Sequence, residues 1–265
     1  MKTGKIVICV LIVFLPLVVL SAQTAPTGEI KGATVRVVSI DAANKKFTYE
    51  ISNKSNQEIT TYSILETFTY SNGIARTFAF THDAWLPWID GRQPKVIQPG
   101  ETLTAPPDWI PAEGVSGDVV KIDLELLLLV YSDLTAEVRA DHGERFTGDQ
   151  MFQEVLENRK AIAQAAKKAA DTISAALNAT GDSPASIALQ SLQSFKENAK
   201  LADHHPTQNP TFYADVDAKE LDADILTLQT LPKGKREREY LAEHLATIQA
   251  RAKLADERAQ LRRLP

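Results

Sequence analysis

A single change of hydrophobic period near residue 145 divides this chain into two halves and constrains its fold more than any other feature. Residues 34–139 alternate apolar and polar side chains, which is the period of strands with one buried face. From about residue 149, apolar residues recur every third or fourth position, which is the period of a helix packed on one side. The sequence therefore predicts strands in the first half and helices in the second.

Turn-forming residues divide the first half into short runs. Such residues occur at 44–45, 53–56, 71–73, 90–91 and 99–100. Short strands at this spacing are typical of an all-β sandwich. We therefore expect an antiparallel β-sandwich over residues 34–140, preceded by a signal segment over residues 1–22 and a linker over residues 23–33.

The longest expected strand, Val119–Tyr131, becomes apolar on both faces along its length. Its even positions are all apolar and are expected to face the core. Its odd positions change from charged to apolar in the order Lys121, Asp123, Glu125, Leu127, Leu129 and Tyr131. Because a strand that is apolar on both faces is covered on both faces, we expect the helical half to pack over the outer side of this strand.

The second half predicts about four helices. The first begins near residue 149 with Thr147 or Asp149 as its cap, and the second begins at Ser183-Pro184. A shorter helix covers about 217–230, and the last covers about 236–262. The last helix has an apolar seam with coiled-coil spacing, made of Leu241, Leu245, Ile248, Ala252, Ala255 and Ala259. The predicted fold class is α+β, with the N-terminal sandwich followed by a C-terminal helical bundle over residues 146–264.

Short motifs in the first half indicate a family. Residues 47–53 read FTYEISN, Ser55 and Ile59 follow, and residues 97–101 read IQPGE. This pattern resembles the small immunoglobulin-like modules of exported bacterial proteins, including FxLYD-type domains. Residues 129–137, with Asn158-Arg159 downstream, look like a pattern in exported proteins of soil bacteria, where glycine is usual at the position of Leu134. The resemblance implies an immunoglobulin-like sandwich and export, and it brings no catalytic residues.

The first 22 residues have the order of a secretory signal peptide. Lys2 and Lys5 precede an uncharged apolar run over residues 6–20, and small residues follow. The run is shorter than the roughly 20 residues of a membrane span, so we expect cleavage after Ala22 and no stable membrane span afterwards. An uncleaved anchor is the alternative. The only cysteine, Cys9, lies in this segment, so the mature chain has no disulfide and fits a bacterial periplasmic or secreted protein.

Motifs that carry chemistry are missing from the sequence. It contains no His-Glu-x-x-His, no phosphate loop, no dinucleotide-binding glycine motif and no nucleophile elbow. The adjacent His204 and His205 point in different directions from a helix end and are a poor pair of metal ligands. With 29 basic against 34 acidic residues, the chain is a poor general binder of nucleic acid. We therefore predict a protein that is not an enzyme and has no cofactor or metal.

Glu66 is the one charge on the apolar face of its strand, between Ile64 and Phe68. A lone buried carboxylate is unfavourable unless it is paired or protonated. A structural role is favoured, either as an inward charge on an edge strand or in a salt bridge to Arg76 or Arg36. The alternative is a group that handles protons.

All three tryptophans lie in proline-rich loops, Trp85 and Trp88 in one and Trp109 in another. Loops on a rigid sandwich commonly carry binding, and tryptophan beside a cation can hold a sugar or a partner surface. We predict that Trp85, Trp88, Arg92 and Trp109 bind a ligand or partner. The alternative is an apolar cluster that closes one end of the sandwich.

Three functions remain open from the sequence. The first is a non-enzymatic binding module of the cell envelope, whose partner is another envelope protein or a glycan. The second is an enzyme with a site near the tryptophan loops, which requires some of Glu66, His82, Asp83, Asp90 and Arg92 to converge. The third is a structural protein that self-associates through its final helix, although packing of that helix within its own chain is favoured.

Overall fold

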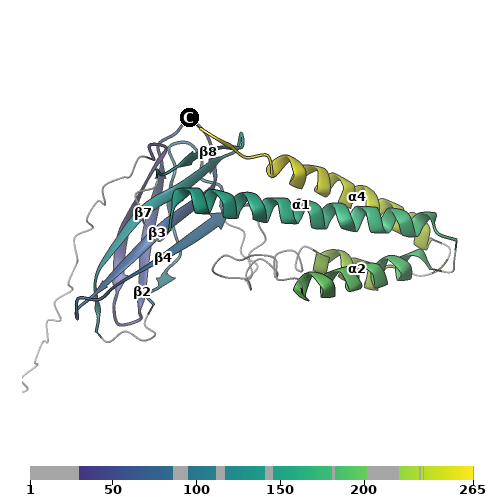
Figure 1. Ribbon diagram of the computed structural model, residues 1–265, viewed down its shortest axis with the longest axis horizontal. Helices are drawn as coiled ribbons and strands as arrows, with labels where there is room; N and C mark the ends of the chain where they lie inside the picture. Colours follow the sequence, from purple (N-terminus) through teal and green to yellow (C-terminus); the bar gives the residue numbers. More distant parts are fainter. Residues whose placement is uncertain are drawn as a thin grey trace, which may run out of the picture.

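The computed structural model describes residues 30–85, 95–111, 117–140, 146–180, 183–201, 221–232, 234 and 236–264. Over these residues the chain is an α+β protein with two β-sheets and with its helices in the C-terminal half, as the change of period predicts. Figure 1 shows the strands gathered at one end and the helices extending away from them. We call these parts the sheet body (residues 30–140) and the helical arm (residues 146–258).

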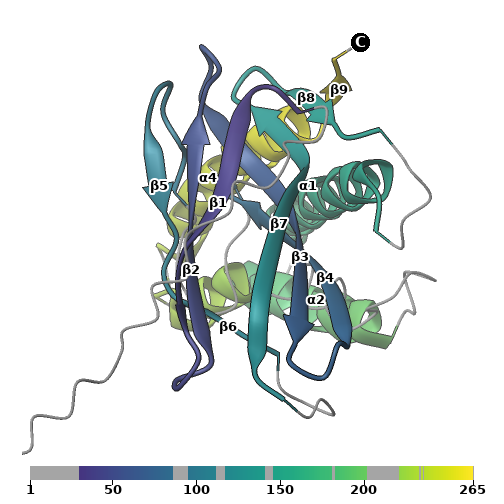
Figure 2. The ribbon, with the colours of Figure 1, turned by 90° about the vertical axis from the view of Figure 1, so that its left-hand side faces the viewer.

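The sheet body contains two sheets. In the first, β2 (Lys46–Asn53) pairs with β1 (Ala33–Asp41) and with two short strands, β5 (Thr102–Thr104) and β6 (Asp108–Trp109). The second has the order β4 (Ala75–Asp83), β3 (Ile59–Tyr70), β7 (Val119–Tyr131), β8 (Thr135–Val138) and β9 (Arg262–Arg263). Figure 2 shows the strands of both sheets in front and the helices behind them.

One buried cluster, the inter-sheet core, contains side chains from both sheets. It is built from the alternate apolar positions that the period of two selects, so each strand contributes one face. Its fully buried large members are Tyr49, Phe47, Phe68, Ile51, Ile59, Ile64, Ile97, Leu124 and Leu129. Removal of this apolar surface from water is the main stabilising contribution to the sheet body.

The register of β7 against β3 shifts in the middle of the strand. Ser63 is paired with Leu128 and Ile64 with Leu126, so Leu127 has no partner position on β3. Such an extra residue is a β-bulge, and it reverses the face on which the following side chains lie.

This bulge corrects the facing expected for the second half of β7. Leu129 and Tyr131 belong to the inter-sheet core, whereas Leu128 and Val130 belong to the cluster that faces the helical arm. The expectation that even positions face the core throughout is therefore wrong at Leu128 and Val130. It is also wrong at Val120, which lies beside another register shift and is 46% exposed.

The expected cover over the outer side of β7 is confirmed. Leu127 is completely buried, and it shares a cluster with Met151, Phe152 and Val155 from the start of the first helix. The apolar outer face of the strand and the apolar stripe of the helix therefore bury each other.

The helical arm is built around α1 (Gly148–Asn178), with α2 (Pro184–Leu201), a helical stretch over residues 221–230 and α4 (Glu237–Arg258). The cap expected at Thr147 is present, because its Oγ1 accepts a hydrogen bond from the backbone N–H of Gln150 at 3.0 Å. In Figure 1, α4 runs beside α1 back towards the sheets, and α2 lies along the other side of α1.

The apolar seam of the last helix packs within its own chain. Leu241 and Ile248 are completely buried and share one cluster with Ala169 and Ile173 of α1. The prediction that the final helix packs within its own chain is therefore confirmed.

The last helix ends earlier than the sequence predicts. Helix α4 stops at Arg258, and β9 then pairs in parallel with β8 in the second sheet. Arg263 of β9 donates to Asp149 at 2.7 Å and lies 4.6 Å from the ring centre of Phe152. The chain therefore leaves the sheet body through α1 and returns to it after α4.

The turn between β7 and β8 forms with leucine at the position where glycine is usual. Leu134 has φ +70°, in the left-handed region that glycine occupies most readily. Its N–H donates to the carbonyl oxygen of Tyr131 at 3.0 Å, and the Asp133 side chain accepts the N–H of Thr135 at 2.9 Å. These hydrogen bonds hold the turn closed against the unfavourable backbone conformation.

Gly148 allows α1 to approach the sheet at its first turn. A Cβ atom at this position would lie 2.5 Å from the carbonyl oxygen of Arg139 and 2.7 Å from that of Leu127. We expect Gly148→Ala to lower the free energy of unfolding by about 1–3 kcal/mol, because backbone atoms cannot yield as a flexible side chain can. Urea unfolding measures the change. The exposed substitution Gln153→Ala, on the same helix, is expected to have almost no effect, and equal effects of the two would contradict the close approach.

Candidate functional site

A buried ion pair joins the sheet body to the helical arm. Arg159 of α1 donates to Asp83 of β4 through Nε at 2.8 Å and through Nη2 at 3.2 Å. The side chains are only 2% and 0% exposed. The guanidinium also donates to Thr61 Oγ1 at 2.7 Å and to the carbonyl oxygen of Arg258 at 3.1 Å. One side chain of α1 therefore binds β3, β4 and the end of α4.

Arg159 is a residue of the candidate site that the sequence did not mark as a site residue. It falls between Phe152 and Ile162 on the apolar stripe of the first helix, where a cation needs a buried acceptor. A cation on this apolar stripe was the signal in the sequence for a buried ion pair. Its acceptor, Asp83, lies 76 positions away, and periodicity gives no register between a strand and a distant helix.

Trp85 lies directly after β4 and against two guanidinium groups. The Cζ atoms of Arg159 and Arg258 are 4.2 Å and 4.6 Å from the centre of its indole ring. Its backbone N–H donates to Asp83 Oδ1 at 3.0 Å, so the carboxylate that holds Arg159 also holds the backbone at Trp85. Cation–π attraction and this hydrogen bond together hold the ring at the base of the arm.

A small cavity, which we call the junction cavity, opens beside Trp85. It has a volume of about 140 Å³ and is lined by Trp85, Arg159, Ile162, Arg251, Leu254, Ala255 and Arg258. Its walls come from the loop after β4 and from facing sides of α1 and α4. The cavity therefore combines apolar walls with positive charge.

The arginines of the junction cavity differ in their partners. Arg159 binds Asp83, and Arg251 binds Asp224. The guanidinium of Arg258 makes no hydrogen bond or ion pair with any residue that the structure describes. Burial and then the positive charge of Arg159 lower the pKa of Arg258, and Asp83 offsets only part of this effect. Arg258 is thus a cation in a partly buried, like-charged setting.

Trp109 is the other predicted binding residue that the structure describes, and it does not line the junction cavity. Trp109 belongs to the first sheet, is 66% exposed, and has Lys46 Nζ 4.8 Å from its ring centre. Trp88 and Arg92 lie outside the described residues. The structure therefore places Trp85 just after β4 of the second sheet and Trp109 on the first sheet, against different cations.

Glu66 points into the inter-sheet core, as the alternation predicts, and is 2% exposed. Its strand is not an edge strand, because β3 lies between β4 and β7. The proposed salt bridge to Arg36 is also wrong, since Arg36 donates to Glu50 at 2.7 Å. Burial, and then the nearby charge of Asp108, raise the pKa of Glu66 to about 8. The side chain is therefore protonated at neutral pH.

His82 lies on the same face of the sheet as Glu66. Its Nε2 is 3.0 Å from Tyr49 Oη, and its ring stacks on that of Tyr62 at 4.7 Å. Burial lowers the pKa of His82 to about 4, so the imidazole is neutral at pH 7. Asp83 faces the opposite side of the sheet, towards Arg159.

The three candidate catalytic residues that the structure describes therefore divide between two faces of one sheet. Glu66 and His82 face the inter-sheet core, and Asp83 faces the helical arm. Asp90 and Arg92, like His204 and His205, lie outside the described residues.

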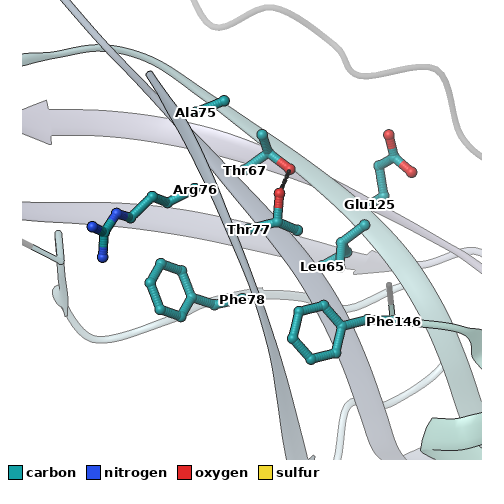
Figure 3. Close-up of a pocket in the computed structure, with 8 residues that line it drawn as sticks. All are labelled: Leu65, Thr67, Ala75, Arg76, Thr77, Phe78, Glu125 and Phe146. Atoms are coloured by element: carbon teal, nitrogen blue, oxygen red, sulfur yellow. Dashed lines mark hydrogen bonds between the residues drawn. The ribbon is translucent and has the colours of Figure 1, made fainter. Parts of the chain in front are cut away.

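A larger hollow than the junction cavity lies on the outer side of the second sheet, near the start of α1. Its volume is about 580 Å³, and Figure 3 shows its lining residues Leu65, Thr67, Ala75, Arg76, Thr77, Phe78, Glu125 and Phe146. In this view the rings of Phe78 and Phe146 lie below the Thr67–Thr77 pair, whose hydroxyls are 3.2 Å apart. Its one lining carboxylate, Glu125, is in an ion pair with Arg139. These residues offer contact surface and no nucleophile beside a base.

Two kinds of feature are absent from the described part of the chain. No group of three or more His, Cys, Asp or Glu side chains there could hold a metal ion, and no helix there is long and apolar enough to cross a membrane. Comparison of the chain with family models, with curated proteins and with solved structures gives no match.

Proposed function

We propose that this chain is an exported, non-enzymatic binding module of the cell envelope, in which an immunoglobulin-like β-sandwich carries a helical arm. The two sheets with a common core support the sandwich, and the motifs at residues 47–59 and 97–101 support the immunoglobulin-like family. The secretory pattern of residues 1–22, which lie outside the described residues, supports export. We propose another envelope protein as the partner.

The separation of the cores supports a scaffold for binding. The inter-sheet core draws on the sheet body, and the largest cluster of the helical arm draws on α1, α2, residues 221–230 and α4. Each part therefore has an apolar core of its own, and the shared cluster around Leu127 and the Asp83–Arg159 pair fix one part to the other. A scaffold of this kind holds surface residues in fixed positions, as a binding module requires.

Trp109 is the single observation that carries the proposal. It is the most exposed of the large apolar side chains in the described chain, yet it lies on a strand paired with β2. Tryptophan is enriched among the residues that dominate the energy of protein interfaces. An exposed indole on a fixed backbone binds with little loss of conformational entropy, so this position suits a partner-binding contact.

We expect Trp109→Ala to abolish capture of the partner in a pull-down from envelope extracts with the mature chain as bait. The variant is expected to fold normally, since the side chain is mostly exposed and its contact with Lys46 is at the surface. Leu226→Ala is the matched control, because Leu226 is 61% exposed on the helical arm. Equal capture by wild type, Trp109→Ala and Leu226→Ala would contradict the proposal.

Treatment of the extract separates a protein partner from a glycan. Protease digestion is expected to remove the captured species, and digestion of cell-wall glycan is expected to leave it. The reverse result would replace the protein partner with a glycan. The bait expressed with residues 1–22 is expected in the envelope fraction with Gln23 as its first residue, and recovery with Met1 still attached would contradict cleavage after Ala22.

A further inference from the structure

We propose that the junction cavity is a binding site for an oxyanion, the carboxylate or phosphate group of a ligand, with the guanidinium of Arg258 as its main contact. This inference does not depend on the partner proposed for Trp109, because Trp109 lies on the first sheet and not at the junction cavity. It rests on the charge balance, the size and the lining of the cavity.

Arg258 differs in its partners from the other arginines that lie over aromatic rings. Among the described residues, Arg159, Arg236, Arg258 and Arg263 lie over aromatic rings. Three of them also bind a carboxylate: Arg159 binds Asp83, Arg236 binds Glu239 and Arg263 binds Asp149. Arg258 is the exception, although it is more buried than Arg236.

The setting of Arg258 favours an incoming anion over water. Arg159 lies against the same indole ring and its charge acts on Arg258, and the carboxylate of Asp83 is already engaged twice by Arg159. An oxyanion would give Arg258 a charge-assisted hydrogen bond and would relieve the repulsion between the two guanidinium groups. A planar guanidinium suits both carboxylate and phosphate oxygens.

The cavity limits what can enter. At about 140 Å³ it admits a small charged group and is below the usual size of a pocket for a whole drug-sized ligand. Ile162, Leu254 and Ala255 form its apolar walls, so the atoms that carry the oxyanion can pack against them. The site therefore fits the charged end of a ligand, and the rest of that ligand lies outside.

Binding would stabilise the junction between body and arm. The cavity is lined by α1, by α4 and by Trp85 of the sheet body, so an anion held there contacts all three. A ligand that binds only the folded chain raises the unfolding temperature, and the increase grows with the logarithm of the ligand concentration once that exceeds Kd.

The test is a titration of the mature protein with sodium acetate and, separately, with sodium phosphate at constant ionic strength. The indole N–H signal of Trp85 is followed by nuclear magnetic resonance and is assigned by its loss in Trp85→Phe. We expect a saturable shift with at least one of the two anions, and the anion that gives it distinguishes a carboxylate from a phosphate ligand. Absence of saturation with both anions would overturn the proposal.

The variants test whether Arg258 is the contact. Arg258→Gln is expected to weaken binding by about tenfold or more, and Arg258→Lys to weaken it less, because charge is kept and the planar fork is lost. Arg236→Gln is the matched control, since Arg236 also lies over a ring, 4.9 Å from the centre of Tyr240. It is expected to leave the affinity unchanged. If Arg236→Gln and Arg258→Gln weakened anion binding equally, the effect would come from the net charge of the protein. That result would overturn the site.

Discussion

Replacement of Asp83 by alanine is expected to lower the free energy of unfolding by about 3–5 kcal/mol, because it leaves the buried guanidinium of Arg159 without its carboxylate. Both side chains are almost inaccessible, so water cannot replace the lost partner. The backbone N–H of Trp85 also loses its acceptor. Urea unfolding followed by circular dichroism measures the change.

An exposed ion pair of the same chain gives the control. Lys167 and Asp171 are 2.6 Å apart on α1, with side chains 72% and 63% exposed. Asp171→Ala is expected to cost less than about 1 kcal/mol, because solvent screens the pair. The double variant Asp83→Leu with Arg159→Met is expected to recover most of the stability lost in Asp83→Ala, since neither charge remains buried. If Asp83→Ala lowered the free energy of unfolding no more than Asp171→Ala does, the buried pair of Asp83 and Arg159 would not have the expected stabilising role.

Glu66→Gln is expected to stabilise the protein by about 3 kcal/mol at pH 7 and to leave its stability at pH 4 nearly unchanged. Burial raises the pKa of Glu66 from 4.5 to about 8 in the folded chain. Below pH 4.5 the carboxyl is protonated in both the folded and the unfolded chain, so it does not lower the free energy of unfolding. Between pH 4.5 and about 8 the unfolded chain releases the proton and the folded chain keeps it, so wild-type stability falls as pH rises.

Unfolding in urea at pH 4, 5.5, 7 and 8.5 tests this pH dependence. His82 acts in the opposite direction, because burial lowers its pKa to about 4 and stability is lost as pH falls from 6.5. The stability lost through His82 is the same in wild type and in Glu66→Gln. The difference in unfolding free energy between the two proteins therefore reports on Glu66 alone. Glu157→Gln, an exposed substitution on α1, is expected to change little at any pH. A difference between Glu66→Gln and wild type that stays constant from pH 4 to pH 8.5 would contradict a buried, protonated carboxyl.

The sequence predicted the features that depend on local chemistry. The period of two located the long strands because each buries one face in the inter-sheet core. Thr147 predicted the start of α1 through its cap, and Ser183-Pro184 predicted the start of α2. The two apolar faces of β7 predicted the packing of the arm over Leu127.

Features that depend on distant partners could not be predicted. A bulge at Leu127 follows from pairing with β3, so the alternation alone gave the wrong face for Leu128 and Val130. The pairing of β9 with β8 ends the last helix at Arg258, although the residues beyond it are compatible with a helix. For the candidate site, Trp85 was predicted and Arg258 was not, because the cavity exists only where α4 returns to α1.

The start of α1 covers the outer face of β7, and methyl nuclear Overhauser measurements on the intact mature chain test this packing most directly. We expect cross-peaks that connect the methyl groups of Leu127, Leu128 and Val130 with those of Met151 and Val155, because these side chains share one buried cluster. Absence of these cross-peaks, together with contacts between the Leu127 methyls and water, would contradict the packing of α1 on β7.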